Sequence, residues 1–249
     1  LLASPEIEIN ILCKIKRPKI QNRFIKPAGF SIKEEEREEP ALHIALNNQN
    51  LEISKLLLSR PEINVNFISE TKDKYSIYEK NAIHIAAMKE NAEIIRLLLN
   101  MPQIEINVPY KSRSINKYYE YNTYESTALH FAAKRENNEI IKLLISKSDA
   151  IVNIPQKHLL CYHDGKVENH FGETALHIAV EEENIEIIQY LLSLDNIDVN
   201  AIFETSFNSP DDYCKKTKTP LVIAINKRNI EIVKLFLTKP ELNINQIIE

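Results

Sequence analysis

The chain has 249 residues, of which 44% are hydrophobic and 27% are charged, and its formal net charge is −4. This net charge is small, so it gives no reason to expect a nucleic-acid or membrane partner. No apolar run approaches the ~20 residues that a membrane-spanning helix needs. The three cysteines, Cys13, Cys161 and Cys214, are too scattered for a disulfide framework, which favours an intracellular location in the cytoplasm or the nucleus.

One sequence frame recurs five times along the chain. Its five starts are Pro40, Asn81, Thr127, Thr174 and Thr219. Counting each start as zero, offset five is always Ala, offsets ten and twenty-six are always Asn, and offset twelve is always Glu. Offset three is a histidine in four units: His43, His84, His130 and His177. The pattern predicts a stack of one repeated unit rather than a single globule around a pocket.

Two helices are predicted in each unit. Apolar residues at offsets two, four and five, such as Leu176, Ile178 and Ala179, lie on one face of a short helix. A second apolar set, for example within residues 94–99, predicts a second helix with a broad buried stripe. The Asn between them suits an N-cap or a left-handed turn. The Glu at offset twelve complements the second helix dipole, and a basic residue three positions later in four units suits i,i+3 pairing on a solvated face.

The Thr-Ala-Leu-His-x-Ala opening, the Glu-Ile-Ile/Val-x-Leu-Leu second helix and the closing Val-Asn resemble ankyrin repeats, whose usual period is about 33 residues. The resemblance covers all five units and, in residues 4–10, the end of a sixth. It implies a mainly α fold, an ankyrin-type helical-hairpin solenoid with β-hairpin fingers. The units depart from the family in having almost no Gly in the inter-helix turn and in starting 41, 46, 47 and 45 residues apart.

The domain organisation follows from the frame. We predict one solenoid over residues 1–249. Its parts are the tail of a truncated repeat (1–10), a long connection (11–39), repeats 40–66, 81–107, 127–153, 174–200 and 219–245, and fingers 67–80, 108–126, 154–173 and 201–218. The connection has a basic and an acidic half, which predicts a solvated hairpin, with a basic strip for an acidic partner as the alternative. Because neither end carries a polar cap, we expect an excerpt from a longer array.

The finger at residues 108–126 carries half of the ten tyrosines in the chain, interleaved with Lys and Arg. These tyrosines are Tyr110, Tyr118, Tyr119, Tyr121 and Tyr124. Tyrosine offers a large contact area and a hydroxyl at low entropic cost, so this finger is a candidate partner-binding surface. Alternate tyrosines can also pack neighbouring hairpins together across strands. The two interpretations are compatible.

The finger at residues 154–173 has residue types found in zinc sites. These residues are His158, Cys161, His163 and His170. Their spacing matches no standard zinc motif, so we expect no metal.

We expect no enzymatic activity and no cofactor. The histidines at offset three recur with the unit, which indicates a structural role in bonding to neighbouring backbone or hydroxyl groups. Catalysis would require a nucleophile or carboxylate beside one particular histidine. The sequence contains no Gly-rich phosphate loop, no paired catalytic acids and no Ser or Cys elbow motif, so a small-molecule substrate is not expected either.

The resemblance to ankyrin repeats places offsets seven to nine in a groove. Along the stack these offsets are polar, then basic, then acidic, then basic. The charged residues expected to bind a partner are Lys134, Arg135, Glu181, Glu182, Glu183, Lys227 and Arg228. The pattern predicts a non-catalytic scaffold for a protein or peptide of mixed charge. The alternatives are solvated helix ends without a partner, and a spacer or targeting arm of a larger protein whose enzymatic part lies outside this segment.

Overall fold

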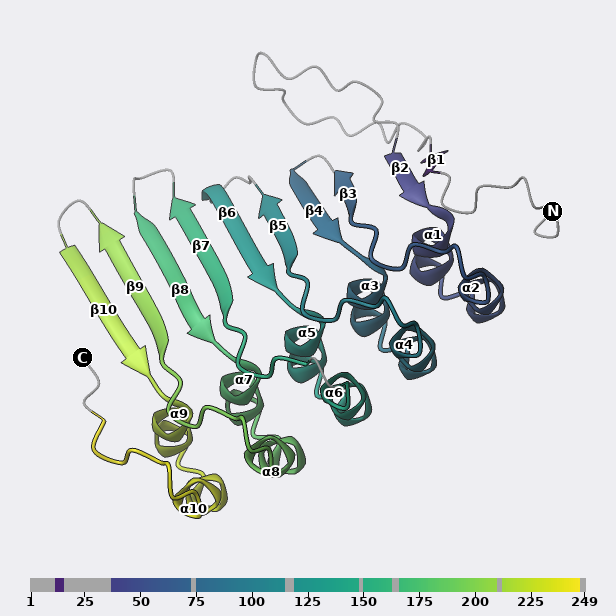
Figure 1. The fold of residues 1–249 in the computed structure, drawn as a ribbon. Coiled ribbons are helices and arrows are strands. Elements are labelled where there is room, and N and C mark those ends of the chain that lie inside the picture. The colour runs from purple at the N-terminus through teal and green to yellow at the C-terminus, as the bar shows by residue number, and fades with distance from the viewer. Residues whose placement is uncertain are drawn as a thin grey trace.

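The computed structural model describes residues 12–15, 37–72, 75–114, 119–147, 150–162, 166–209 and 212–246. The predicted truncated repeat (1–10), most of the long connection, Tyr118 and His163 lie outside the described residues. The described chain forms a layer of helices and a layer of strands (Figure 1). That residues 1–249 form a single domain stays a prediction.

The helical layer consists of an inner and an outer row. The inner helices are α1 (Ala41–Asn47), α3 (Ala82–Met88), α5 (Ala128–Lys134), α7 (Ala175–Glu181) and α9 (Pro220–Asn226). The outer helices are α2 (Leu51–Leu58), α4 (Ala92–Leu99), α6 (Asn138–Ile145), α8 (Ile185–Leu192) and α10 (Ile230–Leu237). Each inner helix contacts the inner helix of the next repeat, and each outer helix contacts the next outer one (Figure 1). The apolar core is therefore a ribbon built between neighbouring repeats.

The Asn at offset ten is the N-cap of the outer helix in every repeat. The side-chain oxygen of Asn137, for example, accepts a hydrogen bond from the backbone N–H of Ile140 at 3.1 Å. The left-handed turn is made instead by the residue before the Asn. These residues are Gln49, Glu90, Glu136, Glu183 and Arg228, with φ between 53° and 58°. Long polar side chains thus occupy a conformation that favours glycine.

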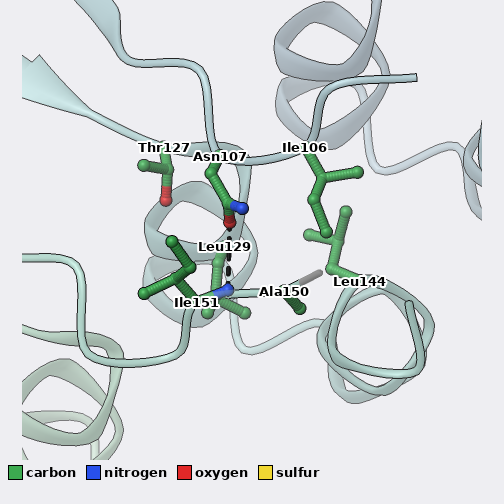
Figure 2. Close-up of a pocket in the computed structure, with 7 residues that line it drawn as sticks. All are labelled: Ile106, Asn107, Thr127, Leu129, Leu144, Ala150 and Ile151. Atoms are coloured by element: carbon green, nitrogen blue, oxygen red, sulfur yellow. Dashed lines mark hydrogen bonds between the residues drawn. The ribbon is translucent and has the colours of Figure 1, made fainter. Parts of the chain in front are cut away.

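The Asn at offset twenty-six joins each repeat to the next. The side chain of Asn153 donates to the carbonyl of Asn196 at 2.7 Å and accepts from the backbone N–H of Asp198 at 2.9 Å. Asn107 accepts from the backbone N–H of Ile151 at 3.1 Å (Figure 2). These bonds satisfy loop backbone groups that no helix or strand pairs, which explains the Asn in physical terms.

A pocket between the second and third repeats surrounds this bond. It is lined by Ile106, Asn107, Thr127, Leu129, Leu144, Ala150 and Ile151 (Figure 2). Its volume of about 10 Å³ is close to the minimum that one water molecule requires. The pocket is part of the packing between repeats and is too small for a substrate.

The basic residues of the outer helices pair mainly across repeats. Lys55 lies 3.5 Å from Glu52 on its own helix but 2.7 Å from Glu93 on the next one. Lys142 on α6 likewise lies 2.5 Å from Glu186 on α8. The expected i,i+3 pairing is thus secondary to an inter-repeat ladder. Because these side chains are exposed and their charges are screened by solvent, each pair contributes little to stability.

The strand layer is one continuous antiparallel sheet rather than a set of separate fingers. Its strands are β3 (Ser69–Lys72), β4 (Ser76–Lys80), β5 (Tyr110–Ser114), β6 (Tyr119–Ser126), β7 (Gln156–Tyr162), β8 (Val167–Glu173), β9 (Phe203–Ser209) and β10 (Asp212–Lys218). All eight strands pair in chain order (Figure 1). The strands β1 (Leu12–Ile15) and β2 (Arg37–Pro40) form a separate two-stranded sheet.

The expectation of a mainly α fold is therefore wrong. Stacked helices lie about 8–10 Å apart, which is close to twice the ~4.8 Å spacing of paired strands. A finger of two strands thus fills the width of one repeat and brings its edge within bonding distance of the next finger. The lengthened fingers pair at β4–β5, β6–β7 and β8–β9, so their edge N–H and C=O groups find partners.

Replacing Glu136 by Gly should stabilise the protein, because Gly adopts the observed φ of 53° without steric cost. We expect the free energy of unfolding to rise by about 1 kcal/mol in a urea titration. The matched control is Glu182→Gly, one position earlier in the turn of the next repeat, where φ is −82°. That variant should lose stability, because Gly adds only conformational entropy to the unfolded chain there. An equal change in the free energy of unfolding of the two variants would contradict the left-handed conformation of Glu136.

Candidate partner-binding surface

The sheet has an inner face, which contacts the inner helices, and an outer face. The Tyr110 ring centroid lies 5.1 Å from that of Phe131 on α5, and the Phe203 ring lies 6.0 Å from His177 on α7. Alternation along each strand then assigns the other residues of the inner face. One row of it, read across neighbouring strands, is Tyr78, Ser112, Tyr124, His158, His170 and Thr205.

Aromatic rings form a continuous chain along this inner face. Tyr124 lies 6.4 Å from Tyr110 and 5.7 Å from His158. His158 stacks on His170 at 5.6 Å, and His170 lies 6.2 Å from Phe203. Tyr110 is buried, whereas the other four rings are half-buried and present part of their surface to solvent. The chain of rings crosses five strands, β5 to β9.

A polar network lies between the rings and the helices. The Tyr124 hydroxyl donates to Gln156 Oε1 at 2.8 Å, and Gln156 Nε2 donates to the Glu173 carboxylate. Burial raises the pKa of Glu173 to about 7, opposed by the positive charge of Lys134 and assisted by the negative charge of Glu181. The sheet and the charged ends of α5 and α7 therefore form one continuous surface, which we call the inner surface.

A β-bulge directs Glu173 to the inner face. Gln156 pairs with Glu173 but Lys157 pairs with Phe171, so Gly172 is the extra residue of β8. Without the bulge, alternation would turn Glu173 to the outer face. Gly172 has a φ of +98°, and a Cβ at this position would lie 2.1 Å from the carbonyl oxygen of Ile202. Only glycine fits there.

The outer face of the sheet compensates its own charges. Ion pairs join neighbouring positions of its strands. They are Lys72–Glu70, Arg113–Glu79, Lys157–Glu125 and Lys215–Glu204. Together with the polar residues between them, these pairs are typical of a solvated surface.

Some of the charges predicted to face a partner are paired within the chain. Arg135 lies 3.3 Å from Glu90 of the preceding repeat, and Lys227 lies 3.5 Å from Glu181. Glu183 accepts a hydrogen bond from Asn229 at 2.8 Å. The alternation of sign along the helix ends therefore also holds successive repeats together.

The predicted tyrosines do not all have described side chains. Tyr110 and Tyr124 lie on the inner face, with Tyr110 only 8% exposed. Tyr119 and Tyr121 belong to β6 and pair with Tyr162 and Cys161 of β7. Cross-strand packing thus accounts for part of the tyrosine pattern, and their role in partner binding stays a prediction. Sequence reasoning missed Gln156 and Glu173, although alternation within residues 154–173 could have identified Gln156.

The repeat histidines are buried structural groups. The Nδ1 atom of His84 accepts from the backbone N–H of Asn81 at 3.2 Å, and its Nε2 donates to the carbonyl of Val108 at 2.9 Å. His130 and His177 repeat the first bond with Thr127 and Thr174, each at 3.2 Å. Burial lowers the pKa of these three histidines to about 4. They are neutral near pH 7 and tie α3, α5 and α7 to their own first residues.

The candidate zinc ligands are divided between the two faces of the sheet. His158 and His170 pair on the inner face, whereas Cys161 pairs with Val167 on the outer face. Within the described part of the chain, no three His, Cys, Asp or Glu side chains are grouped so as to hold a metal ion.

Comparison with known families agrees with the repeat architecture. A family model of ankyrin repeats matches residues 10–110, 67–156, 111–201 and 156–247, which together span residues 10–247. The chain belongs to the ankyrin repeat family. Ankyrin repeats are generally modules of protein–protein interaction, and the family is typically non-catalytic. No curated protein matches this ankyrin-repeat chain. Among its described residues, no helix is both long and apolar enough to cross a membrane.

Replacing Gly172 by Ala should destabilise the protein by about 2 kcal/mol or more, since the new Cβ meets backbone and φ is positive. The measurement is urea-induced unfolding. Asn169→Ala, on the outer face of the same strand, is the control and should change stability little. A neutral Gly172→Ala would show that the bulge is not required.

Stability should fall as the pH drops from about 6.5 towards 4. In this range the unfolded chain takes up protons on histidines that the folded chain keeps neutral, which costs ~1.4 kcal/mol per pH unit for each histidine. Glu173 acts in the opposite direction, because its folded pKa of about 7 exceeds the usual 4.5.

Urea titrations at several pH values test both contributions. Glu173→Gln should make the loss steeper between pH 7 and 4.5, because the opposing proton uptake of the folded state is removed. Parallel stability profiles for this variant and the unmodified chain would contradict the raised pKa of Glu173.

Proposed function

We propose that this chain is a non-catalytic scaffold that binds a protein or peptide of mixed charge through its inner surface. The observation that carries the proposal is the continuous chain of half-buried rings beside helix ends of both signs. Aromatic side chains dominate the binding energy of many interfaces, and Tyr combines an apolar ring with a polar tip. The free thiols of Cys161 and Cys214 support an intracellular location.

The continuity of the sheet supports this proposal. Each finger pairs with its neighbours through backbone hydrogen bonds, so the side chains of the inner face are held in fixed relative positions. A preorganised surface loses less conformational entropy on binding than a set of independent loops. The inner surface is thus suited to recognition of an extended feature of a partner.

The charges of the inner surface support a partner of mixed sign. Lys134 is exposed at the end of α5, and Glu181 and Glu182 are exposed at the equivalent end of α7. Opposite charges in successive repeats set the orientation and association rate of a partner more than its affinity.

Deleting the tyrosine-rich finger is a poor test of this function. The strands β5 and β6 pair with β4 on one side and β7 on the other. Removing them would expose two new sheet edges and invite aggregation. Substitutions at exposed helix ends are cleaner, because they leave the strand pairing intact.

We expect a charge reversal in one repeat, with Lys in place of Glu181, Glu182 and Glu183, to change which proteins an immobilised chain captures from a cell extract. The salt dependence of their binding should change as well. The reason is the inverted charge of the inner surface in one repeat. The affinity for a bound partner should change at least several-fold.

The control for this experiment reverses Glu93, Glu139 and Glu186, which lie on the outer helices and give the same change in net charge. Melting curves of both variants verify that they remain folded. Identical capture by the unmodified chain and both variants would contradict the proposal and favour a spacer.

A further inference from the structure

The spacing of the inner surface along the stack follows from the sheet. Each of the four fingers between successive repeats contributes two strands to the sheet of β3 to β10. Since neighbouring strands lie ~4.8 Å apart, equivalent points of successive repeats are about 10 Å apart along the inner face. A partner that lies along the stack meets equivalent groups at this interval.

A polyproline-II segment has a matching period. It has three residues per turn and rises ~3.1 Å per residue, so every third side chain recurs at ~9.3 Å. An α-helix needs seven residues, about 10.5 Å, to cover the same interval, and it is 10–12 Å wide. Both periods fit the repeat spacing, so the chemistry of the inner face has to distinguish them.

In the row of the inner face, three consecutive rings are flanked on each side by a small polar side chain. Going from β5 to β9 it reads Ser112, Tyr124, His158, His170 and Thr205. A polyproline-II segment has no internal hydrogen bonds and offers its carbonyl groups outward, whereas a helix bonds its own. Aromatic-lined surfaces with polar tips are the usual recognition sites of such segments. The row therefore fits an extended segment better than a helix.

The charges at the helix ends fit the same period. Lys134 and Glu182 lie at neighbouring positions of the turn in the third and fourth repeats. Among the described residues neither has an ion-pair partner, whereas Arg135 and Lys227 are paired. Because Lys134 and Glu182 differ by one position in their repeats, an acidic partner residue at Lys134 and a basic one at Glu182 would be about one repeat apart. The nearest whole number of residues in an extended segment is three.

We propose that the inner surface binds a polyproline-II segment of a partner protein, lying along the stack, in which an acidic and a basic residue are three positions apart. This inference rests on the proposed function and specifies the class of partner. The rings contact the proline-rich face of the segment, and the two charges set its register.

The test uses synthetic proline-rich peptides with a fluorescent label, titrated with the intact chain. The acidic and basic residues are placed two, three or four positions apart, and a further peptide forms a helix with the two charges seven positions apart. We expect the spacing of three to bind roughly fivefold tighter than the spacings of two and four, the effect of one misplaced ion pair. Equal binding of the three spacings, or tighter binding of the helical peptide, would overturn the inference.

A charge variant gives an independent readout. Lys134→Glu should prefer a peptide with two basic residues three positions apart over the acid–base peptide, the reverse of the unmodified chain. Lys142→Glu, on the outer helix of the same repeat, is the matched control and should keep the original preference. An unchanged preference in Lys134→Glu would also overturn the inference.

The outcomes separate this inference from the function on which it rests. Should protein capture depend on Glu181, Glu182 and Glu183 while the peptides show no spacing preference, only the polyproline-II inference fails. Should capture be indifferent to these residues as well, the proposed function fails with it.

Discussion

The match between two distances underlies this architecture. Helices stacked 8–10 Å apart leave room for two strands ~4.8 Å apart in each repeat. Because of this match, the finger of one repeat bonds to the finger of the next, as at β6–β7 and β8–β9. The structure is therefore two commensurate layers, one of helices and one of strands, joined at the start of every inner helix.

Several polar contacts hold the repeats in this spacing. The side chain of Asn153 bonds two backbone groups of the following repeat, and the outer helices add ion pairs such as Lys142–Glu186. Inside the stack, buried histidines such as His84 satisfy the backbone where finger and helix meet. Each contact is modest, but its recurrence keeps successive repeats in register and so keeps the sheet continuous.

The inner surface combines two kinds of constraint. The row of rings depends on strand register, since a slip of one residue would turn Tyr124 and His158 to the outer face. Glu173 depends on the bulge at Gly172, which interrupts that alternation at a single point. The backbone hydrogen bonds that form the sheet therefore also place the side chains of the inner surface. A change in strand register would alter both the fold and this surface.

The sequence by itself determined the repeat and its two helices, because helical periodicity is local and each unit repeats it. It left the Asn at offset ten open between an N-cap and a left-handed turn, and the structure shows the N-cap. The sequence also indicated the tyrosine-rich finger and the structural role of His84 and its equivalents. The continuous sheet and the place of Glu173 were decided only by tertiary structure. Pairing between fingers joins residues such as Tyr124 and His158, 34 positions apart, through backbone groups that every residue carries, so no sequence motif marks it.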